Sequence, residues 1–213
     1  MNAILYLHGF ASSPRSKKAQ YFSARFAEAG TGILVPELAT EGLGNLTLSG
    51  QLRAIEQAVG ERAAGGRAVS LIGSSLGGYL AALYASRHPE VEKLVLLAPA
   101  FGFARRWAES LGADRMRSWQ ASGSMNVMDY ATGRPAELGW QLMEDARAYE
   151  EEPAIAQPCL IYHGTHDDVV PLEASRSFAS RRSCVELREM DSGHELLNVL
   201  EEMWVGTRRF LLD

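Results

Sequence analysis

The sequence has few cysteines, no excess of positive charge and no long apolar run, and each shortage excludes a class of protein. Only Cys159 and Cys184 occur among 213 residues. Each lies near the start of an expected buried strand, where cysteine most often serves as a small hydrophobe and not as a disulfide or metal ligand. The formal net charge is -5, and nucleic-acid binding depends on clustered Lys and Arg. Nucleic acid is therefore not an expected partner.

A membrane helix needs about 20 consecutive apolar residues, and no stretch of the sequence approaches this length. The chain also opens on a strand-like segment with no basic region before it, unlike a secretory signal. We expect a soluble, cytoplasmic protein without a membrane span. With 46% hydrophobic and 22% charged residues, the chain can bury one substantial core. We therefore expect one domain over residues 1–213, and the sequence leaves the oligomeric state open.

Short apolar runs alternate with helical patterns, which is typical of a parallel sheet covered by helices on both faces. Expected strands cover residues 2–7, 32–35, 68–73, 93–97, 159–163 and 184–189. Helices are expected over 16–29, 76–87 and 196–212, and the spacing of Leu52, Ile55 and Val59 indicates another, capped by Ser49. The sequence thus predicts an α/β fold with a mostly parallel sheet of about six strands. Residues 100–152 are too long for a simple connection, so we expect a small helical lid there.

The strongest motif is Gly-Ser-Ser-Leu-Gly at residues 73–77, which directly follows an expected strand and opens an expected helix. A Gly-x-Ser-x-Gly pattern in this context is typical of the nucleophile elbow of the α/β-hydrolase fold. Glycine is favoured two residues before and after the nucleophile because the turn is sharp and crowded. The register makes Ser75 the nucleophile, and not Ser74. The alternative is a glycine-rich turn with an incidental serine.

Two backbone N–H groups are candidates for stabilising the oxyanion that forms when a serine attacks a carbonyl. Leu76 opens the helix after the elbow, where N–H groups lack helical acceptors and the helix dipole is positive. Phe10 follows His8 and Gly9 in the loop after the first strand, a position that offers the second donor in this fold. We expect His8 to support that loop by hydrogen bonding, because a catalytic base also needs a buried carboxylate within reach.

The remaining partners of a serine nucleophile are expected after the last two strands. Asp167 and Asp168 lie in the loop after residues 159–163, and His194 follows the strand at 184–189. The order Ser, Asp, His along the chain is that of α/β-hydrolases. Asp167 is the expected acid because it occupies the Asp position of the pattern His-Gly-x-x-Asp-x-x-Val-Pro, both counted from His163 and counted back from Pro171. Asp168 is instead expected to bond to backbone N–H groups of the loop, as Asp often does in turns. His88 and His166 are expected to be structural.

Three segments together resemble a known group of proteins: Tyr-Leu-His-Gly-Phe followed by Ser-Ser-Pro at residues 6–14, the elbow at 73–79 and the acid loop at 163–171. They are similar to YqiA-type esterases and to ABHD10-like acyl thioesterases of the α/β-hydrolase superfamily. The resemblance implies hydrolysis of acyl esters or thioesters of short to medium chain length, with no cofactor and no metal. The chain differs in its longer lid and lacks the His-Gly-Gly-Gly loop of lipase-like relatives.

Two other functions fit parts of the same pattern. A small peptidase or amidase would use the same triad, although no acidic subsite for a peptide amine is visible. A binding protein could keep the cleft without catalysis, although all expected site residues are present. The lid adds a further question, because it contains Trp107, Trp119, Trp140, Met116, Met125, Met128 and Met143. These side chains are expected either to form the lid's own core or to line an adaptable acyl pocket.

Overall fold

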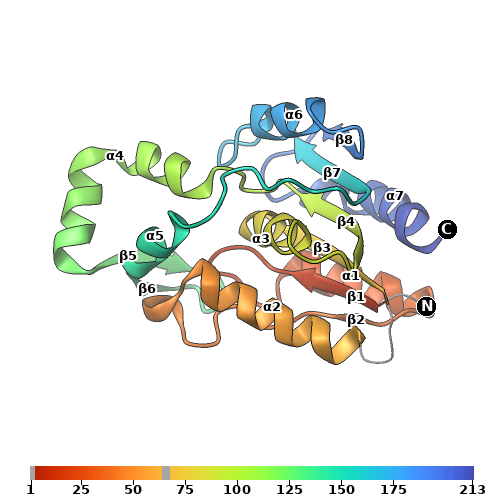
Figure 1. Cartoon of the computed structure of the whole chain (residues 1–213), viewed down its shortest axis with the longest axis horizontal. Coiled ribbons are helices and arrows are strands. Elements are labelled where there is room, and N and C mark those ends of the chain that lie inside the picture. Colours follow the sequence, from red (N-terminus) through yellow and green to blue (C-terminus); the bar gives the residue numbers. More distant parts are fainter. Residues whose placement is uncertain (1–2, 64–67) are drawn as a thin grey trace.

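The computed structural model describes residues 3–63 and 68–213 and contains a six-stranded parallel sheet in the order β2-β1-β3-β4-β7-β8 (Figure 1). The strands are β1 (Ala3–Leu7), β2 (Ile33–Leu34), β3 (Val69–Ser74), β4 (Val91–Leu97), β7 (Cys159–Gly164) and β8 (Val185–Met190). The predicted α/β fold with about six parallel strands is confirmed. Position 2, expected to open the first strand, lies outside the described residues.

Helices cover both faces of the sheet because successive strand residues point to opposite sides. On one face, Tyr6 of β1 packs in a cluster with residues of α1 (Lys17–Glu28) and α7 (Leu200–Leu212). On the other face, Leu5 of the same strand shares a cluster with α2 (Leu48–Ala63), α3 (Leu76–Ala85) and α6 (Leu172–Ser180). Helix α6 has no counterpart among the predicted helices.

The start of α2 differs from the prediction. Ser49 was the expected cap, but it lies inside the helix, and its backbone N–H donates to Asp145 at 2.7 Å. The cap is wrong by two residues, because Thr47 Oγ1 accepts the backbone N–H of Gly50 at 2.9 Å. This is the bond that a capping side chain makes three residues ahead. Thr47 therefore begins the helix, and Ser49 ties α2 to a distant segment.

The segment between β4 and β7 contains a β-hairpin in addition to the predicted helices. Helix α4 (Phe103–Ser122) is kinked at Gly112, and the antiparallel pair β5 (Ser124–Asp129) and β6 (Arg134–Gly139) leads to α5 (Gln141–Ala146). In Figure 1, α4 arches away from the sheet and the chain returns through the hairpin toward α2. Short 3-10 helices, η1 (Leu43–Asn45) and η2 (Leu197–Val199), complete the elements that bear on the site.

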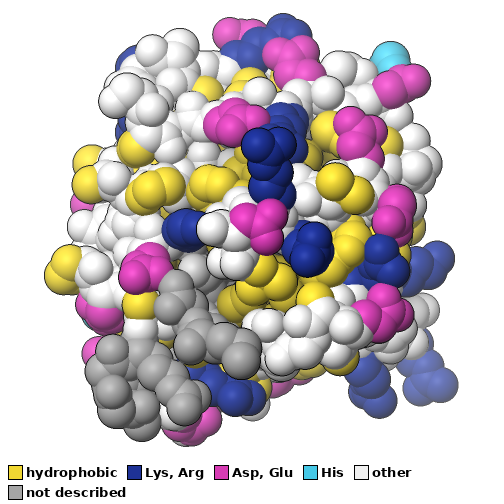
Figure 2. Space-filling model, turned by 90° about the vertical axis from the view of Figure 1, so that its right-hand side faces the viewer, with side chains coloured by type: hydrophobic (Ala, Val, Ile, Leu, Met, Phe, Trp, Pro, Cys, Tyr) yellow, Lys and Arg dark blue, Asp and Glu magenta, His cyan; other side chains and the backbone are white. Residues whose placement is uncertain are grey.

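The face of the molecule at the amino ends of the strands carries mixed charge. Figure 2 shows Lys and Arg interspersed with Asp and Glu and with apolar side chains on this face, so its drawn surface has no large patch of one sign. Within residues 3–63 and 68–213, no helix has both the length and the apolarity needed to span a bilayer.

Candidate active site

Ser75 lies at the sharp turn between β3 and α3 with φ 53° and ψ -117°. Positive φ is costly for a residue with a Cβ and persists only where the surroundings hold it. The surroundings here are backbone hydrogen bonds: Ser75 N donates to Leu97 O at 2.8 Å, and Ser75 O accepts from Ala100 N at 3.0 Å. The turn is thus fixed by the end of the neighbouring strand β4, and it raises the Ser75 side chain above the carboxyl edge of the sheet.

The two motif glycines have a steric reason. A Cβ at Gly73 would lie 2.3 Å from the carbonyl oxygen of Gly77, and a Cβ at Gly77 would lie 2.2 Å from that of Leu7. Neither approach is possible for a real side chain, since both contacts are with backbone atoms. The spacing Gly-x-Ser-x-Gly is therefore a packing requirement of β1, β3 and α3 around the turn.

The structure brings Ser75, Asp167 and His194 together from three loops. His194 follows β8, and its Nε2 lies 3.1 Å from Ser75 Oγ. Its Nδ1 lies 2.8 Å from Oδ2 of Asp167, which follows β7. A carboxylate on Nδ1 holds the proton there and leaves Nε2 free to accept the serine hydroxyl. The three side chains thus have the geometry of a nucleophile, a general base and an orienting acid.

Asp167 is held by several donors, whereas Asp168 is exposed. The side chain of Asp167 is fully buried, and its Oδ1 accepts the N–H groups of Val169 and Val170 at 2.9 and 2.8 Å. Burial would raise the pKa of Asp167, but hydrogen bonds from His163, His194 and Val170 outweigh it and hold the pKa well below its ordinary value. Asp167 is therefore ionised at neutral pH and can stabilise a protonated His194.

His163 is a site residue that the sequence did not reveal as one. It ends β7, is completely buried, and its Nε2 lies 3.2 Å from Asp167 Oδ2 and 2.9 Å from Val170 O. Its Nδ1 lies 2.7 Å from Ser175 Oγ in α6. Nε2 of the ring faces two acceptors, and Nδ1 faces a hydroxyl that can either donate or accept. A signal was present, since a histidine four residues before the acid is part of the loop pattern.

Lys18 is a second residue that motifs could not reveal. It lies in the first turn of α1, only 8% exposed, and its Nζ donates to the carbonyl oxygen of Glu195 at 2.9 Å. Burial lowers the pKa of Lys18, while the carboxylates of Glu195 and Asp167 act in the opposite direction. Lys18 thus tethers α1 to the backbone next to His194.

The loop after β1 lies beside the elbow. A Cβ at Gly9 would be 3.4 Å from Ser75 Cβ, so the backbone around Phe10 passes close to the serine. Neither Phe10 N–H nor Leu76 N–H donates to an acceptor among the described residues. Both are available to an oxyanion, and the dipole of α3 adds positive potential at Leu76.

The other histidines lie in different surroundings. His8 is buried, with Nδ1 3.0 Å from Gly9 O, and its Nε2 accepts Leu38 N–H at 3.2 Å. Its Nε2 also lies 3.3 Å from Oε1 of Glu37, whose side chain is exposed and not buried. His88 stacks on Tyr84, and His166 pairs with Asp191 at the surface.

Aromatic side chains connect the site to the segment after β4. Phe10 and Trp107 meet edge to face with ring centroids 5.1 Å apart. Trp107 contacts Trp119, which contacts Trp140, at 5.5 and 5.2 Å. Trp119 is buried and donates from Nε1 to Leu138 O at 3.0 Å. Trp119 and Trp140 belong to the same buried cluster as Leu5 and Leu71 of the sheet, so the segment packs into the main core. Trp107 is only partly buried and adjoins the loop beside Ser75.

A parallel sheet that carries a serine elbow after its third strand, with an acid and a histidine after the last two, defines the α/β-hydrolase fold class. The chain belongs to the family described as Uncharacterised protein family (UPF0227), whose model matches residues 3–208. This agrees with the resemblance to YqiA-type proteins.

Two solved structures show the same fold. Mouse alpha/beta hydrolase domain-containing protein 10 superposes with a TM-score of 0.83 at 18% identity, over 98% of this chain and 89% of that one. Est1E from Butyrivibrio proteoclasticus, with ferulic acid bound, superposes with a TM-score of 0.84 at 22% identity, over 100% of this chain and 88% of that one.

Proposed function

We propose that the protein is a serine hydrolase that cleaves carboxylic esters or thioesters of short to medium acyl chains through an acyl-enzyme. The observation that carries the proposal is the continuous hydrogen-bonded line from Ser75 Oγ through the ring of His194 to Asp167. The line lies beside two backbone N–H groups that have no acceptor among the described residues. The chemistry is complete in these groups, and no step calls on a metal or cofactor.

In the first half of the reaction, His194 Nε2 takes the proton of Ser75 while Oγ bonds to the carbonyl carbon of the substrate. The negative charge moves to the carbonyl oxygen, where the N–H groups of Phe10 and Leu76 stabilise it. The Asp167 carboxylate stabilises the protonated His194. As the tetrahedral intermediate collapses, His194 gives its proton to the departing alkoxide or thiolate, and the acyl group stays on Ser75.

In the second half, water replaces the leaving group. His194 takes a proton from the water, whose oxygen attacks the acyl carbon, and the same N–H groups stabilise the new oxyanion. His194 then returns the proton to Ser75 Oγ as the carboxylic acid leaves. Each donor to the oxyanion is worth about 3 kcal/mol in the barrier, by analogy with other serine hydrolases.

The acyl chain length in the proposal comes from the resemblance to YqiA-type and ABHD10-like proteins, and the aromatic contact of Phe10 with Trp107 supports an apolar acyl site. Phe10 supplies its backbone N–H toward the oxyanion, so its ring and that of Trp107 lie near the place where the acyl chain begins. Such apolar rings favour burial of an acyl chain. Trp119 is buried, so among the lid tryptophans we assign the contact with the acyl chain to Trp107 and not to Trp119.

The first test is the nucleophile. We expect the purified protein to hydrolyse p-nitrophenyl acetate or butyrate in the presence of a chelator and to be labelled by a fluorophosphonate probe. Ser75→Ala should abolish both, because no other hydroxyl lies against His194 Nε2 among the described residues. Ser74→Ala is the matched control and should keep labelling and turnover. Labelling of the Ser75→Ala protein at the parent rate, or activity lost to the chelator, would contradict the proposal.

A further inference from the structure

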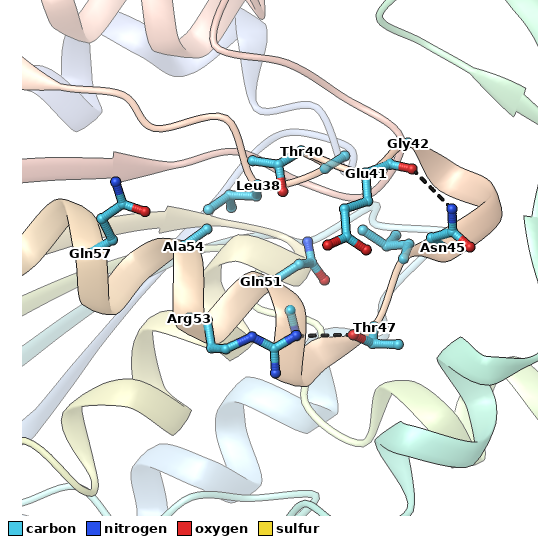
Figure 3. Close-up of a pocket in the computed structure, with 13 residues that line it drawn as sticks. Leu38, Thr40, Glu41, Gly42, Asn45, Thr47, Gln51, Arg53, Ala54 and Gln57 are labelled. Carbon is cyan, nitrogen blue, oxygen red and sulfur yellow. Dashed lines mark hydrogen bonds between the residues drawn. The ribbon is translucent and has the colours of Figure 1, made fainter.

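A second concave site lies apart from the serine, between the segment of residues 38–47 and helix α2. It is a cavity of about 310 Å³ whose lining includes Leu38, Glu41, Asn45, Gln51 and Arg53 (Figure 3). None of the triad residues lines it, and neither Phe10 nor Leu76 does. Its volume is at the small end of the range for ligand pockets, so it suits a small metabolite.

Gln51 marks this cavity as a binding site. Its side chain is only 2% exposed, yet Oε1 has no hydrogen-bond partner among the described residues. A buried amide oxygen without a donor is unfavourable, and such groups are rare in folded proteins. Figure 3 shows the Gln51 amide projecting from α2 into the space that Glu41 borders from the opposite segment. A donor from a bound molecule would satisfy this oxygen.

Two charged side chains of opposite sign border the same cavity. Glu41 lies on the segment before η1, and Arg53 lies on α2 close to Gln51. Both residues are exposed to solvent, and neither forms an ion pair with any described residue. Arg53 offers a planar fork of N–H donors suited to a carboxylate, while Glu41 and Gln51 Oε1 both accept hydrogen bonds.

We propose that this cavity binds a small zwitterion of the α-amino acid type. The carboxylate of the ligand pairs with Arg53, and its ammonium group donates to Glu41 and to Gln51 Oε1. The combination explains why an acid, a base and a buried acceptor meet in one small space. An anion alone leaves Glu41 and the Gln51 oxygen without a partner, and an uncharged polyol leaves both charges unpaired. The proposal does not depend on the chemistry at Ser75.

The experiment is a titration that does not use catalysis. Glycine, L-alanine and L-glutamine are titrated into the purified protein by calorimetry, with ethylamine, propionate and glycerol as comparison compounds. We expect saturable binding of at least one amino acid, about tenfold or more tighter than binding of any compound with one charge or none, since hydrogen bonds to charged groups are the strong ones.

Variants locate the binding. Arg53→Gln and Glu41→Gln should each weaken it about tenfold, and Gln51→Leu should abolish it. Arg62→Gln and Glu56→Gln, on the same helix but outside the cavity lining, should bind like the parent. Gln51→Leu should not lower the melting temperature of the ligand-free protein, because it removes an unpaired buried oxygen. Should Gln51→Leu fail to fold, Arg53→Gln and Glu41→Gln still show whether the ligand binds in this cavity.

The proposal is overturned by three results. One is the absence of saturable binding by any of the amino acids up to about 10 mM, beyond the millimolar range of weak small ligands. Another is equal binding of ethylamine, propionate or glycerol. The third is binding that Arg53→Gln and Glu41→Gln leave unchanged, which would put the ligand elsewhere, including at Ser75.

Discussion

Single residues decide which of two neighbouring carboxylates serves His194. Asp167 is buried and accepts from His194 and two backbone N–H groups, while Asp168 is exposed. Both carboxylate oxygens of Asp167 accept hydrogen bonds, one from His194 and the other from the backbone N–H groups. An asparagine has only one amide oxygen, so its NH₂ group would face a donor on one of these sides. We therefore expect Asp167→Asn to lower kcat at least about 100-fold, with the loss of about 10⁴-fold known for a serine protease as the upper guide.

Asp168→Asn is the matched control, since it makes the same chemical change one residue away. It should remain within about tenfold of the parent in kcat. Circular dichroism and the melting temperature check that both variants are folded. If Asp168→Asn is the more damaging of the two in folded protein, the acid is misassigned, while the nucleophile test at Ser75 is unaffected.

Lys18 acts on the site through another residue, because among the described residues its hydrogen bond next to His194 is to the backbone oxygen of Glu195. We propose it as a positioning residue. Lys18→Met keeps the apolar stem and removes the donor, so the His194 loop loses a tether. We expect kcat to fall about tenfold with KM unchanged, which corresponds to one hydrogen bond from a charged group.

The control for Lys18 is its neighbour Lys17, which is exposed; Lys17→Met should behave like the parent. Lys18→Arg should restore part of the activity, because arginine can still donate from the same helix turn. A Lys18→Met protein that melts lower but keeps its full kcat would mean that the lysine is purely structural.

Among the elements, we expect the segment from α4 to α5 to determine which acyl chain lengths the protein prefers. Trp107 adjoins Phe10, whereas Trp119 is buried in the main hydrophobic cluster. We expect Trp107→Ala to change the relative rates on p-nitrophenyl acetate, butyrate and octanoate by about tenfold, the value of one or two methylenes in an apolar pocket. The rate of fluorophosphonate labelling at Ser75 should change less.

Met128→Ala serves as the control for this element, because Met128 lies on the hairpin and is 47% exposed. It should leave the profile of rates as it is in the parent. Trp119→Ala does not test the idea, since loss of a buried tryptophan costs about 3–5 kcal/mol and disturbs the whole segment. If folded Trp107→Ala protein keeps the same relative rates on the three esters, Trp107 does not contribute to the acyl site.

The elements that the sequence predicted are those with a strong periodic or compositional signal. Most of the strands contain short apolar runs, whereas β8 mixes apolar and charged residues. Helix α1 places Ala19, Phe22 and Phe26 on one buried face as its spacing predicts. The hairpin β5–β6 is weakly patterned, because Ser124 and Met125, which point to opposite faces of β5, are both partly buried. Its pairing depends on tertiary contacts that periodicity does not express.

Across the whole molecule, a feature could be predicted from the sequence when its residues lie close together along the chain. The elbow and the acid loop are local patterns, and their order along the chain was enough to select Ser75, Asp167 and His194. The contact of Lys18 with Glu195 joins residues 177 positions apart, and Gln51 faces a cavity only because residues 38–47 fold over α2. Neither has a motif, so only the assembled fold reveals them.

The separation of the triad along the chain has a consequence for biosynthesis. Ser75 and His194 are 119 residues apart, and they meet only after β8 has joined β7 at the end of the sheet. In the mechanism that we propose, Ser75 lacks its base while the ribosome is still making the segment between the two residues. A nascent chain would therefore carry no activated serine that cellular acyl donors could modify, and we expect reactivity to appear only with the finished sheet.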